Sequence, residues 1–222
     1  MANVARINGF SPVKYLSGAP YNGAANTYAI PTSDTTNSYA IGDIVMSAGG
    51  ADDNGVIYVK KIPVANASDF KALGVVVGIE PVVAGVSLVG TNLDLNVIYI
   101  EAGTRTAVRY ILVADDPNLV FEASAGTTAT NFTAAKARYN SGICSNTGSD
   151  VTYDISQALT QTAPLSNVVL SSATVNTTNT LPVQLLGLAR YPDNTFGAYA
   201  RMLCRFNSHE FGVATGTNFT GI

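Results

Sequence analysis

Short apolar runs separated by turn residues are the feature of this sequence that most constrains its fold. Turn signals recur about every 8–12 residues, which is typical of β-sandwiches and β-barrels. The dipeptide Asn54-Gly55 is a strong hairpin signal, and the apolar run at 56–60 follows it as the returning strand. Residues 73–79 are continuously apolar, which predicts a strand buried on both faces. The sequence therefore predicts an all-β fold.

Alternating residue types predict further strands. Within 106–114, Tyr110 points to one face and Arg109 to the other. Two segments carry weak helix signals, 68–72 and 131–138, and each is long enough for only one or two turns. The second begins at an asparagine, a residue type favoured at helix N-caps. The remaining predicted strands are 42–46, 95–100, 119–121, 150–154, 167–170, 181–189 and 199–206.

The charge content of the chain is low. Charged residues make up 12% of the sequence, against roughly 25% in average soluble proteins. Hydrophobic residues make up 47%, which excludes an intrinsically disordered chain, since disorder needs low hydrophobicity and high net charge. The formal net charge is −3. This charge argues against nucleic acid as a partner, because domains that bind it electrostatically are strongly basic.

No segment predicts a membrane or secreted protein. The longest apolar run, 74–79, is far shorter than the roughly 20 residues that cross a bilayer. Residues 1–6 lack the apolar core of a signal peptide. Two cysteines, Cys144 and Cys204, are too few for a disulfide framework. We therefore expect synthesis in a cytoplasm, with both thiols reduced and no membrane partner.

Two segments differ in composition from the β-rich body. Residues 1–23 hold aromatic and apolar residues without a clean period, and Pro12 and Pro20 interrupt regular structure. From the residues alone, this segment either packs on the chain's own core or forms an extended arm ordered by a neighbouring subunit. Residues 123–180 are rich in Ser, Thr, Asn, Gly and Ala. We predict an antiparallel β-barrel or sandwich with a single domain at 24–222 and a long loop-rich insertion at about 123–180.

Residues for nucleophilic catalysis are sparse. The one histidine, His209, follows Ser208, and neighbouring residues of a strand point to opposite faces. No Gly-x-Ser-x-Gly elbow occurs. Strand alternation places Cys204 beside Met202 and Phe206, which predicts a buried thiol rather than a nucleophile. We expect no enzyme activity, and we expect His209 to be a polar surface or interface residue.

Metal-binding patterns are equally sparse. One histidine and two distant cysteines cannot supply a structural zinc site. Asp52-Asp53 and Asp115-Asp116 offer oxygen ligands of the kind that calcium binds, but neither pair has EF-hand spacing. Aspartates in turns ordinarily cap main-chain amides. The sequence leaves open a pair of glycosidase carboxylates, although it contains no tryptophan. We predict no cofactor and no metal, with calcium at one of the aspartate turns as the alternative.

Five blocks of sequence occur in order along the chain outside 123–180. The most specific block is Tyr110-Ile-Leu-Val-Ala-Asp-Asp-Pro-Asn-Leu-Val-Phe-Glu122. The others are Asn8-Gly-Phe-Ser-Pro-Val-Lys-Tyr15 with Gly18-Ala-Pro-Tyr-Asn-Gly23, Tyr28-Ala-Ile-Pro31 with Ile41-Gly-Asp-Ile-Val45, Asp52-Asp-Asn-Gly-Val56 with Gly74-Val-Val-Val-Gly78, and Leu186-Gly-Leu-Ala-Arg-Tyr-Pro-Asp-Asn-Thr-Phe-Gly-Ala-Tyr-Ala-Arg201 with Arg205-Phe-Asn-Ser-His209. Together these blocks resemble the head decoration (capsid cement) proteins of tailed bacteriophages.

The resemblance implies a structural virion protein on the outer surface of the phage capsid, made in the cytoplasm of the bacterial host. Its implied partners are the major capsid protein and further copies of itself, as a homotrimer at local three-fold positions. The family has no catalytic residues, so none is assigned. The chain departs from the family pattern at Ala123-Ser124, where a glutamine is expected, and in a longer Gly/Thr tail after His209.

Under this resemblance, residues 1–23 form an extended N-terminal arm that supplies the expected contacts. An arm of this kind can add strands or aromatic anchors to a neighbour. We expect capsid or subunit contacts from Phe10, Val13, Tyr15, Leu16 and Tyr21. Two other classes stay open: a tail or fibre component that binds host surface glycans, and an intracellular β-barrel enzyme that uses Asp115, Asp116 and His209.

Overall fold

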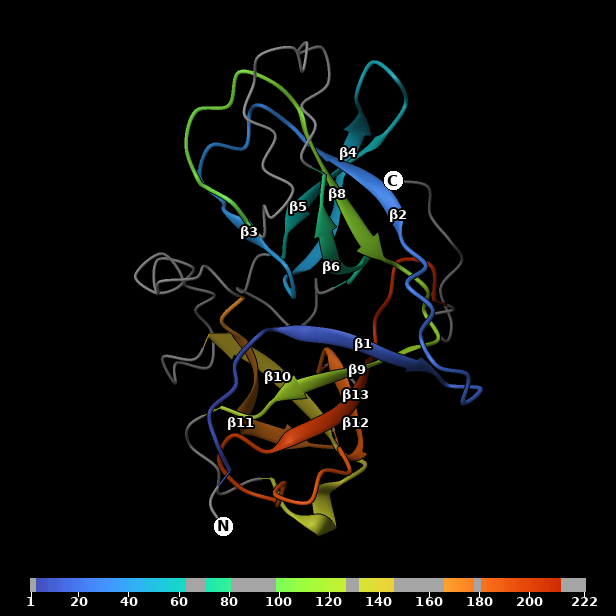
Figure 1. Cartoon of the computed structure of the whole chain (residues 1–222), viewed down its shortest axis with the longest axis vertical. Coiled ribbons are helices and arrows are strands. Elements are labelled where there is room, and N and C mark those ends of the chain that lie inside the picture. The colour runs from blue at the N-terminus through green and yellow to red at the C-terminus, as the bar shows by residue number, and fades with distance from the viewer. Residues whose placement is uncertain are drawn as a thin grey trace.

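The computed structural model confirms the predicted all-β fold (Figure 1). It describes residues 3–62, 71–80, 99–126, 132–145, 166–177 and 181–212. Within these ranges, the one helical element is a 3₁₀ turn, η2 (Ala134–Lys136), and no helix is long and apolar enough to cross a membrane. The strands form a closed barrel, a six-stranded sheet, and a small pair made by β3 (Tyr39–Ala40) and β7 (Tyr99–Ile100).

The barrel forms the upper half of the molecule in Figure 1 and closes in the order β2-β5-β4-β6-β8. Neighbouring strands are antiparallel except β2 and β5, which pair in parallel through Ala29 and Tyr58. One parallel pair is unavoidable, because an odd number of strands cannot close with every neighbour antiparallel. The barrel strands are β2 (Asn26–Ile30), β4 (Ile44–Ala51), β5 (Ile57–Lys61), β6 (Gly74–Ile79) and β8 (Arg109–Ala114).

The six-stranded sheet lies below the barrel in the order β1-β9-β13-β12-β10-β11, with every pair antiparallel. The edge strand β11 curves back toward β9. The N–H of Gly126, just after β9, donates to the carbonyl of Leu170 in β11 at 3.0 Å. The strands β1 and β9 pair directly, although the whole barrel lies between them in sequence. The sheet strands are β1 (Phe10–Tyr15), β9 (Leu119–Ser124), β10 (Asn140–Ser145), β11 (Val168–Asn176), β12 (Val183–Leu188) and β13 (Arg201–Phe206).

Two glycines allow the sheet and the barrel to meet. The N–H of Phe10, the first residue of β1, donates to the carbonyl of Gly42 at 3.0 Å. Gly9 and Gly42 have φ angles of +69° and +94°, in the left-handed region that favours glycine. A Cβ atom on Gly42 would lie 2.1 Å from the carbonyl oxygen of Asn8. The close backbone contact at this joint therefore requires glycine.

A second connection joins the chain after β13 to the barrel. The N–H of Ala72 donates to the carbonyl of Ser208 at 3.0 Å, and the N–H of Glu210 donates to the carbonyl of Ala72 at 2.9 Å. The Glu210 carboxylate accepts the N–H of Ser47 in β4 at 2.6 Å. Hydrogen bonds thus join the sheet to the barrel both at the start of β1 and after the end of β13.

Two apolar cores follow from this arrangement. One fills the barrel and includes Ile30, Val59 and Ile111. The other, which we call the lower core, lies between the sheet and the underside of the barrel. In it, the ring of Phe206 lies 5.7 Å from that of Phe10 and 4.9 Å from that of Phe121. Side chains of β4, β6 and β8 join this second core, so its packing couples the two halves.

Most predicted strands are confirmed, with shifted ends. The predicted strands 42–46, 56–60, 73–79, 106–114, 119–121, 167–170, 181–189 and 199–206 correspond to β4, β5, β6, β8, β9, β11, β12 and β13. In 95–100, only the end is described and forms β7, and 150–154 lies outside the described residues. No strand is predicted where β1, β2, β3 and β10 lie.

The two helix predictions have different outcomes. In 131–138 a single 3₁₀ turn forms, with Thr133 rather than Asn131 at its N-cap position, and Asn131 lies outside the described residues. In 68–72, residues 68–70 also lie outside them, and the prediction is wrong at Ala72. This residue is extended because its main chain is hydrogen-bonded to Ser208 and Glu210.

Part of the segment predicted as an arm is a strand of the chain's own sheet. Residues 10–15 form β1, and Phe10 is 1% exposed. Its burial against Phe121 and Phe206 explains why this part packs on the chain's own core. Within the predicted insertion at 123–180, β10 and β11 complete one edge of the same sheet.

Candidate interaction surface

β1 and the turn after it present the side chains that are predicted to contact a partner. Val13 and Leu16 are 40% and 42% exposed. Tyr15 and Tyr21 are partly buried against the lower core, and their rings lie 6.5 Å apart. These four residues form what we call the N-terminal hairpin surface. The prediction of a partner contact for Phe10 is corrected, because its buried side chain belongs to the core.

The turn holds this surface rigidly and closes the outer edge of β1. The N–H of Tyr15 donates to the carbonyl of Ala19 at 2.8 Å, and the N–H of Tyr21 donates to the carbonyl of Val13 at 3.0 Å. The register of β1 against β9 shifts at Val13, and the preceding Pro12 has no N–H to offer. A partner strand therefore finds few free main-chain groups along this edge. We therefore expect a partner to contact this edge through side chains rather than by adding a strand to the sheet.

A polar network borders the N-terminal hairpin surface. The Tyr28 hydroxyl donates to Asp115 Oδ2 at 2.6 Å, and the Asn26 amide donates to both oxygens of the same carboxylate at 3.0 and 2.9 Å. Burial and, next, the hydrogen bond to Asp115 raise the pKa of Tyr28. Burial also raises the pKa of Tyr21, followed by the effects of Tyr15 and Asp115. Both phenols therefore stay protonated donors at neutral pH.

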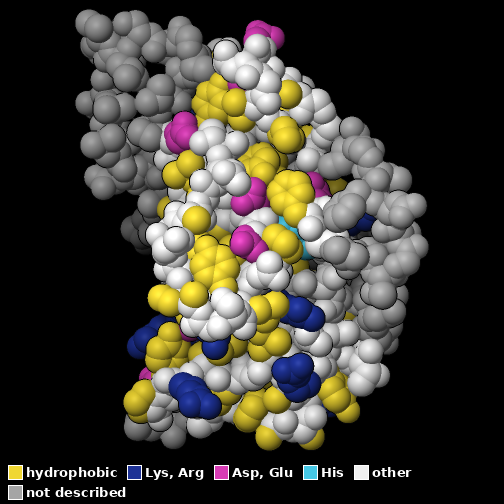
Figure 2. All heavy atoms as spheres, turned by 90° about the vertical axis from the view of Figure 1, so that its right-hand side faces the viewer, with side chains coloured by type: hydrophobic (Ala, Val, Ile, Leu, Met, Phe, Trp, Pro, Cys, Tyr) yellow, Lys and Arg dark blue, Asp and Glu magenta, His cyan; other side chains and the backbone are white. Residues whose placement is uncertain are grey.

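Figure 2 shows the face on the right-hand side of Figure 1, where β1 ends. Hydrophobic side chains run down this face from the barrel to the sheet. Most of its acidic side chains lie over the barrel, whereas Lys and Arg gather over the sheet. This face therefore combines apolar contact area with a division of charge between the two halves.

The aspartate pairs occupy turns, as predicted. Asp52 Oδ1 accepts the N–H groups of Asn54 and Val56 at 2.9 and 2.8 Å, and Oδ2 accepts the Tyr110 hydroxyl at 2.6 Å. Asp116 Oδ1 accepts the N–H of Asn118 at 2.7 Å. The bond from Tyr110 is the main cause of a lowered pKa at Asp52. Among the described residues, no group of three or more His, Cys, Asp and Glu side chains is placed to hold a metal.

His209 packs at the joint between the two halves. It is 9% exposed, its Nδ1 accepts the N–H of Phe211 at 3.1 Å, and its buried Nε2 has no hydrogen-bond partner. On the face shown in Figure 2, only a small area of histidine colour (cyan) is visible. Burial lowers the pKa of His209 to about 4, against the raising effects of Asp115 and Asp116. The prediction of a surface position for His209 is wrong, because its ring is buried between the sheet and the barrel.

Both cysteines are buried, and for Cys204 the sequence predicts this burial. Cys204 is fully buried beside Met202 in the lower core. Burial is the main cause that raises the pKa of its thiol. A thiol held protonated in the core is inert toward oxidants and electrophiles.

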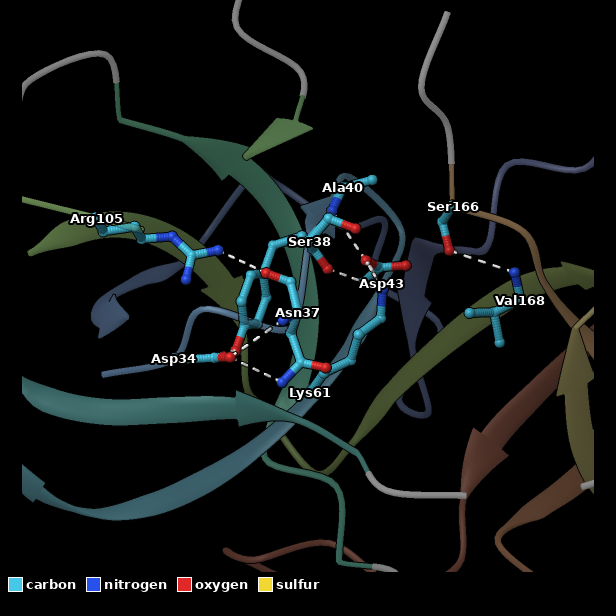
Figure 3. Close-up of polar contacts among 10 residues, drawn as sticks. Asp34, Asn37, Ser38, Ala40, Asp43, Lys61, Arg105, Ser166 and Val168 are labelled. Atoms are coloured by element: carbon cyan, nitrogen blue, oxygen red, sulfur yellow. Dashed lines mark hydrogen bonds and ion pairs between the residues drawn. The ribbon is translucent and has the colours of Figure 1, made fainter. Parts of the chain in front are cut away.

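A buried ion pair inside the barrel is the polar feature that the sequence does not reveal (Figure 3). Lys61 Nζ lies 2.7 Å from Asp43 Oδ2, and their side chains are 4% and 0% exposed. Lys61 also donates to the carbonyl of Ser38 at 3.0 Å, and Asp43 accepts the N–H of Ala40 at 2.9 Å. Burial lowers the pKa of Lys61, and Asp43 opposes that shift. The pair fixes β5 against the segment that enters β4.

A neighbouring network at the same end of the barrel involves Asp34. Its Oδ1 accepts the main-chain and side-chain N–H groups of Asn37 at 3.2 and 2.9 Å, and its Oδ2 accepts the Tyr39 hydroxyl (Figure 3). Arg105, from the loop before β8, donates to the carbonyl of Asn37 at 2.5 Å. These bonds order the segment between β2 and β4.

Comparisons of the chain with models of known protein families, with curated proteins and with solved structures give no match.

Proposed function

We propose that this protein is a head decoration protein of a tailed bacteriophage, which binds the outer surface of the capsid and stabilises contacts between capsomers. The observation that carries the proposal is where the five sequence blocks lie in the fold. They fall on β1, on β2 and the start of β4, on the β4–β5 turn and β6, on β8 and β9, and on β12 and β13. The resemblance to decoration proteins therefore rests on the strands that build both halves of the molecule.

The joined halves suit a mechanical role. β1 pairs with β9 while its first residue binds the barrel, and the chain after β13 binds the barrel again. The core between them packs Phe10, Phe121 and Phe206 of the sheet against aliphatic side chains of the barrel such as Ile44 and Val75. A stiff body of this kind transmits force between the proteins that it bridges without yielding at a hinge. Decoration in many copies also lets modest single contacts give strong attachment.

We assign the contact with the major capsid protein to the N-terminal hairpin surface. Val13 and Leu16 project from a rigid turn, and the half-buried Tyr15 and Tyr21 support them. Burial of an exposed aliphatic side chain in an interface contributes about 1.5–3 kcal/mol. Homotrimer formation and location on the outside of the virion belong to the same proposal.

The test is co-sedimentation of the purified full chain with emptied, expanded shells of the phage that encodes it. Wild type should pellet with shells, and Leu16→Ser should bind them at least about tenfold more weakly. Ile57→Ser is the matched control, because Ile57 is 45% exposed but lies on the β4–β5 hairpin of the barrel. This control should bind shells like wild type.

Two outcomes would overturn parts of the proposal. If wild type fails to pellet with shells, and antibody against it labels the tail tip in electron micrographs, the protein is a tail or fibre component. If Leu16→Ser and Ile57→Ser bind equally well, the N-terminal hairpin surface is not the contact. Decoration of the head would then involve another face.

A further inference from the structure

Two arginines at the top of the barrel lie in a hollow of about 330 Å³ formed by the loop that leads into β8. Arg105 and Arg109 line it together with Thr104, Thr106 and Glu101. The loop is anchored to the segment between β2 and β3. The N–H of Gly103 donates to the carbonyl of Thr35 at 2.9 Å. Arg105 donates through Nη2 to the carbonyl of Asn37, as Figure 3 shows. These hydrogen bonds to the segment between β2 and β3 hold the loop, and with it the hollow, in place.

Neither arginine has a carboxylate partner in the described part of the chain. The ion pairs found there are Lys61 with Asp43 and Arg201 with Glu122. Arg105 uses only Nη2, on the carbonyls of Asn37 and Glu101 at 2.5 and 3.0 Å. Its Nε and Nη1, and the Nε of Arg109, are buried without an acceptor. Buried donors without acceptors are rare in native proteins, and each one calls for an explanation.

The two positive charges also act on one another. Burial lowers the pKa of Arg109, and the neighbouring Arg105 lowers it further. Like charges held together in partly buried positions destabilise a fold unless a counter-ion binds between them. A negatively charged group in the hollow would relieve the repulsion and accept hydrogen bonds from the guanidinium groups.

We propose that Arg105 and Arg109 form a binding site for an oxyanion, either a free phosphate or a carboxylate. The planar forks of guanidinium groups match the oxygens of both groups, and the threonine hydroxyls that line the hollow add further donors. The site lies on the barrel, whereas the N-terminal hairpin surface lies on the sheet. It is a property of the free chain and stands independently of capsid binding.

The test measures thermal unfolding of the full chain as inorganic phosphate or acetate replaces chloride at constant ionic strength. Wild type should show a saturable rise in melting temperature. Arg109→Gln should lose this rise, with affinity weakened at least about tenfold. Lys60→Gln removes an exposed charge elsewhere on the barrel and should keep the wild-type response. A response to phosphate identifies a phosphate site, and a response to acetate alone identifies a carboxylate site.

A second readout separates binding from a structural role of Arg109. In chloride alone, Arg109→Gln should melt at or above the wild-type temperature, because the substitution removes the repulsion from Arg105. A large fall in melting temperature in chloride would overturn the proposal, since it would show that Arg109 has a stabilising partner within the chain. Equal anion responses of wild type and both variants, or no response to either anion, would also overturn it.

Discussion

Breaking the buried ion pair between Lys61 and Asp43 should destabilise the protein strongly. Their side chains are 4% and 0% exposed, and the charged atoms lie 2.7 Å apart. In Lys61→Met, Asp43 keeps the N–H of Ala40 but loses its nearest cation. In Asp43→Leu, Lys61 keeps the carbonyl of Ser38 but loses its nearest anion. Removal of one partner of a buried pair typically costs about 3–5 kcal/mol.

Loss of the lysine's proton limits the cost in Asp43→Leu. At neutral pH, a buried lysine can lose its proton at a cost of about 4–5 kcal/mol, given a reference pKa of about 10.4. The double variant Lys61→Met/Asp43→Leu leaves no buried charge of the pair, so it should regain at least half of the sum of the two losses.

The assay is urea unfolding, which gives the free energy of unfolding and its urea dependence, repeated across a pH series. The deficit of Asp43→Leu should shrink as the pH rises toward about 10, because burial lowers the pKa of Lys61 and Asp43 no longer opposes the loss of its proton. Lys60→Met, at the exposed neighbouring position, is the control and should change stability by less than about 0.5 kcal/mol.

Losses below about 1 kcal/mol in both single variants would refute the reasoning, because exposed ion pairs behave in that way. A deficit of Asp43→Leu that does not change with pH would refute it as well. It would mean that lost packing, rather than a buried charge without its counter-ion, explains the instability.

Three further predictions concern the joint and the core. The free energy of unfolding should fall by about 3 kcal/mol as the pH drops from 6.5 to about 4, because burial lowers the pKa of His209 in the folded protein and the unfolded chain therefore binds this proton first. In the same urea series, His209→Phe should lack this part of the acid sensitivity. Gly42→Ala should cost about 2–4 kcal/mol, since its Cβ would meet the Asn8 carbonyl at 2.1 Å. Gly49→Ala, with a φ of +77° and no atom near its Cβ, should cost only about 1 kcal/mol, and a difference below about 0.5 kcal/mol between the two would contradict the close contact. Neither Cys144 nor Cys204 should react with a thiol reagent until the protein unfolds; rapid labelling of the native protein would show that the lower core opens.

Local patterns in the sequence predict much of the fold. The hairpin at Asn54-Gly55 forms between β4 and β5, with Gly55 at a φ of +82°. The alternation in β13 places Met202, Cys204 and Phe206 in the core, as expected. These predictions succeed because periodicity and turn chemistry act over a few residues.

Contacts between distant segments could not be predicted in this way. The pairing of β1 with β9 joins residues that the whole barrel separates in sequence, and it turns Phe10 from a candidate contact into a core residue. Lys61 belongs to a sequence of two lysines that resembles a solvated strand end. The one available signal is that Lys61 shares the inward face of β5 with Val59. The partner Asp43, and the hollow around Arg105 and Arg109, follow only from the tertiary fold.

The disruption temperature of emptied phage shells, measured by calorimetry with and without the purified protein, tests the central proposal most directly. If the protein is a head decoration protein, saturating amounts should raise this temperature, and Leu16→Ser should raise it less than Ile57→Ser at equal concentration. Shells that melt at the same temperature with and without the wild-type protein would contradict the proposal.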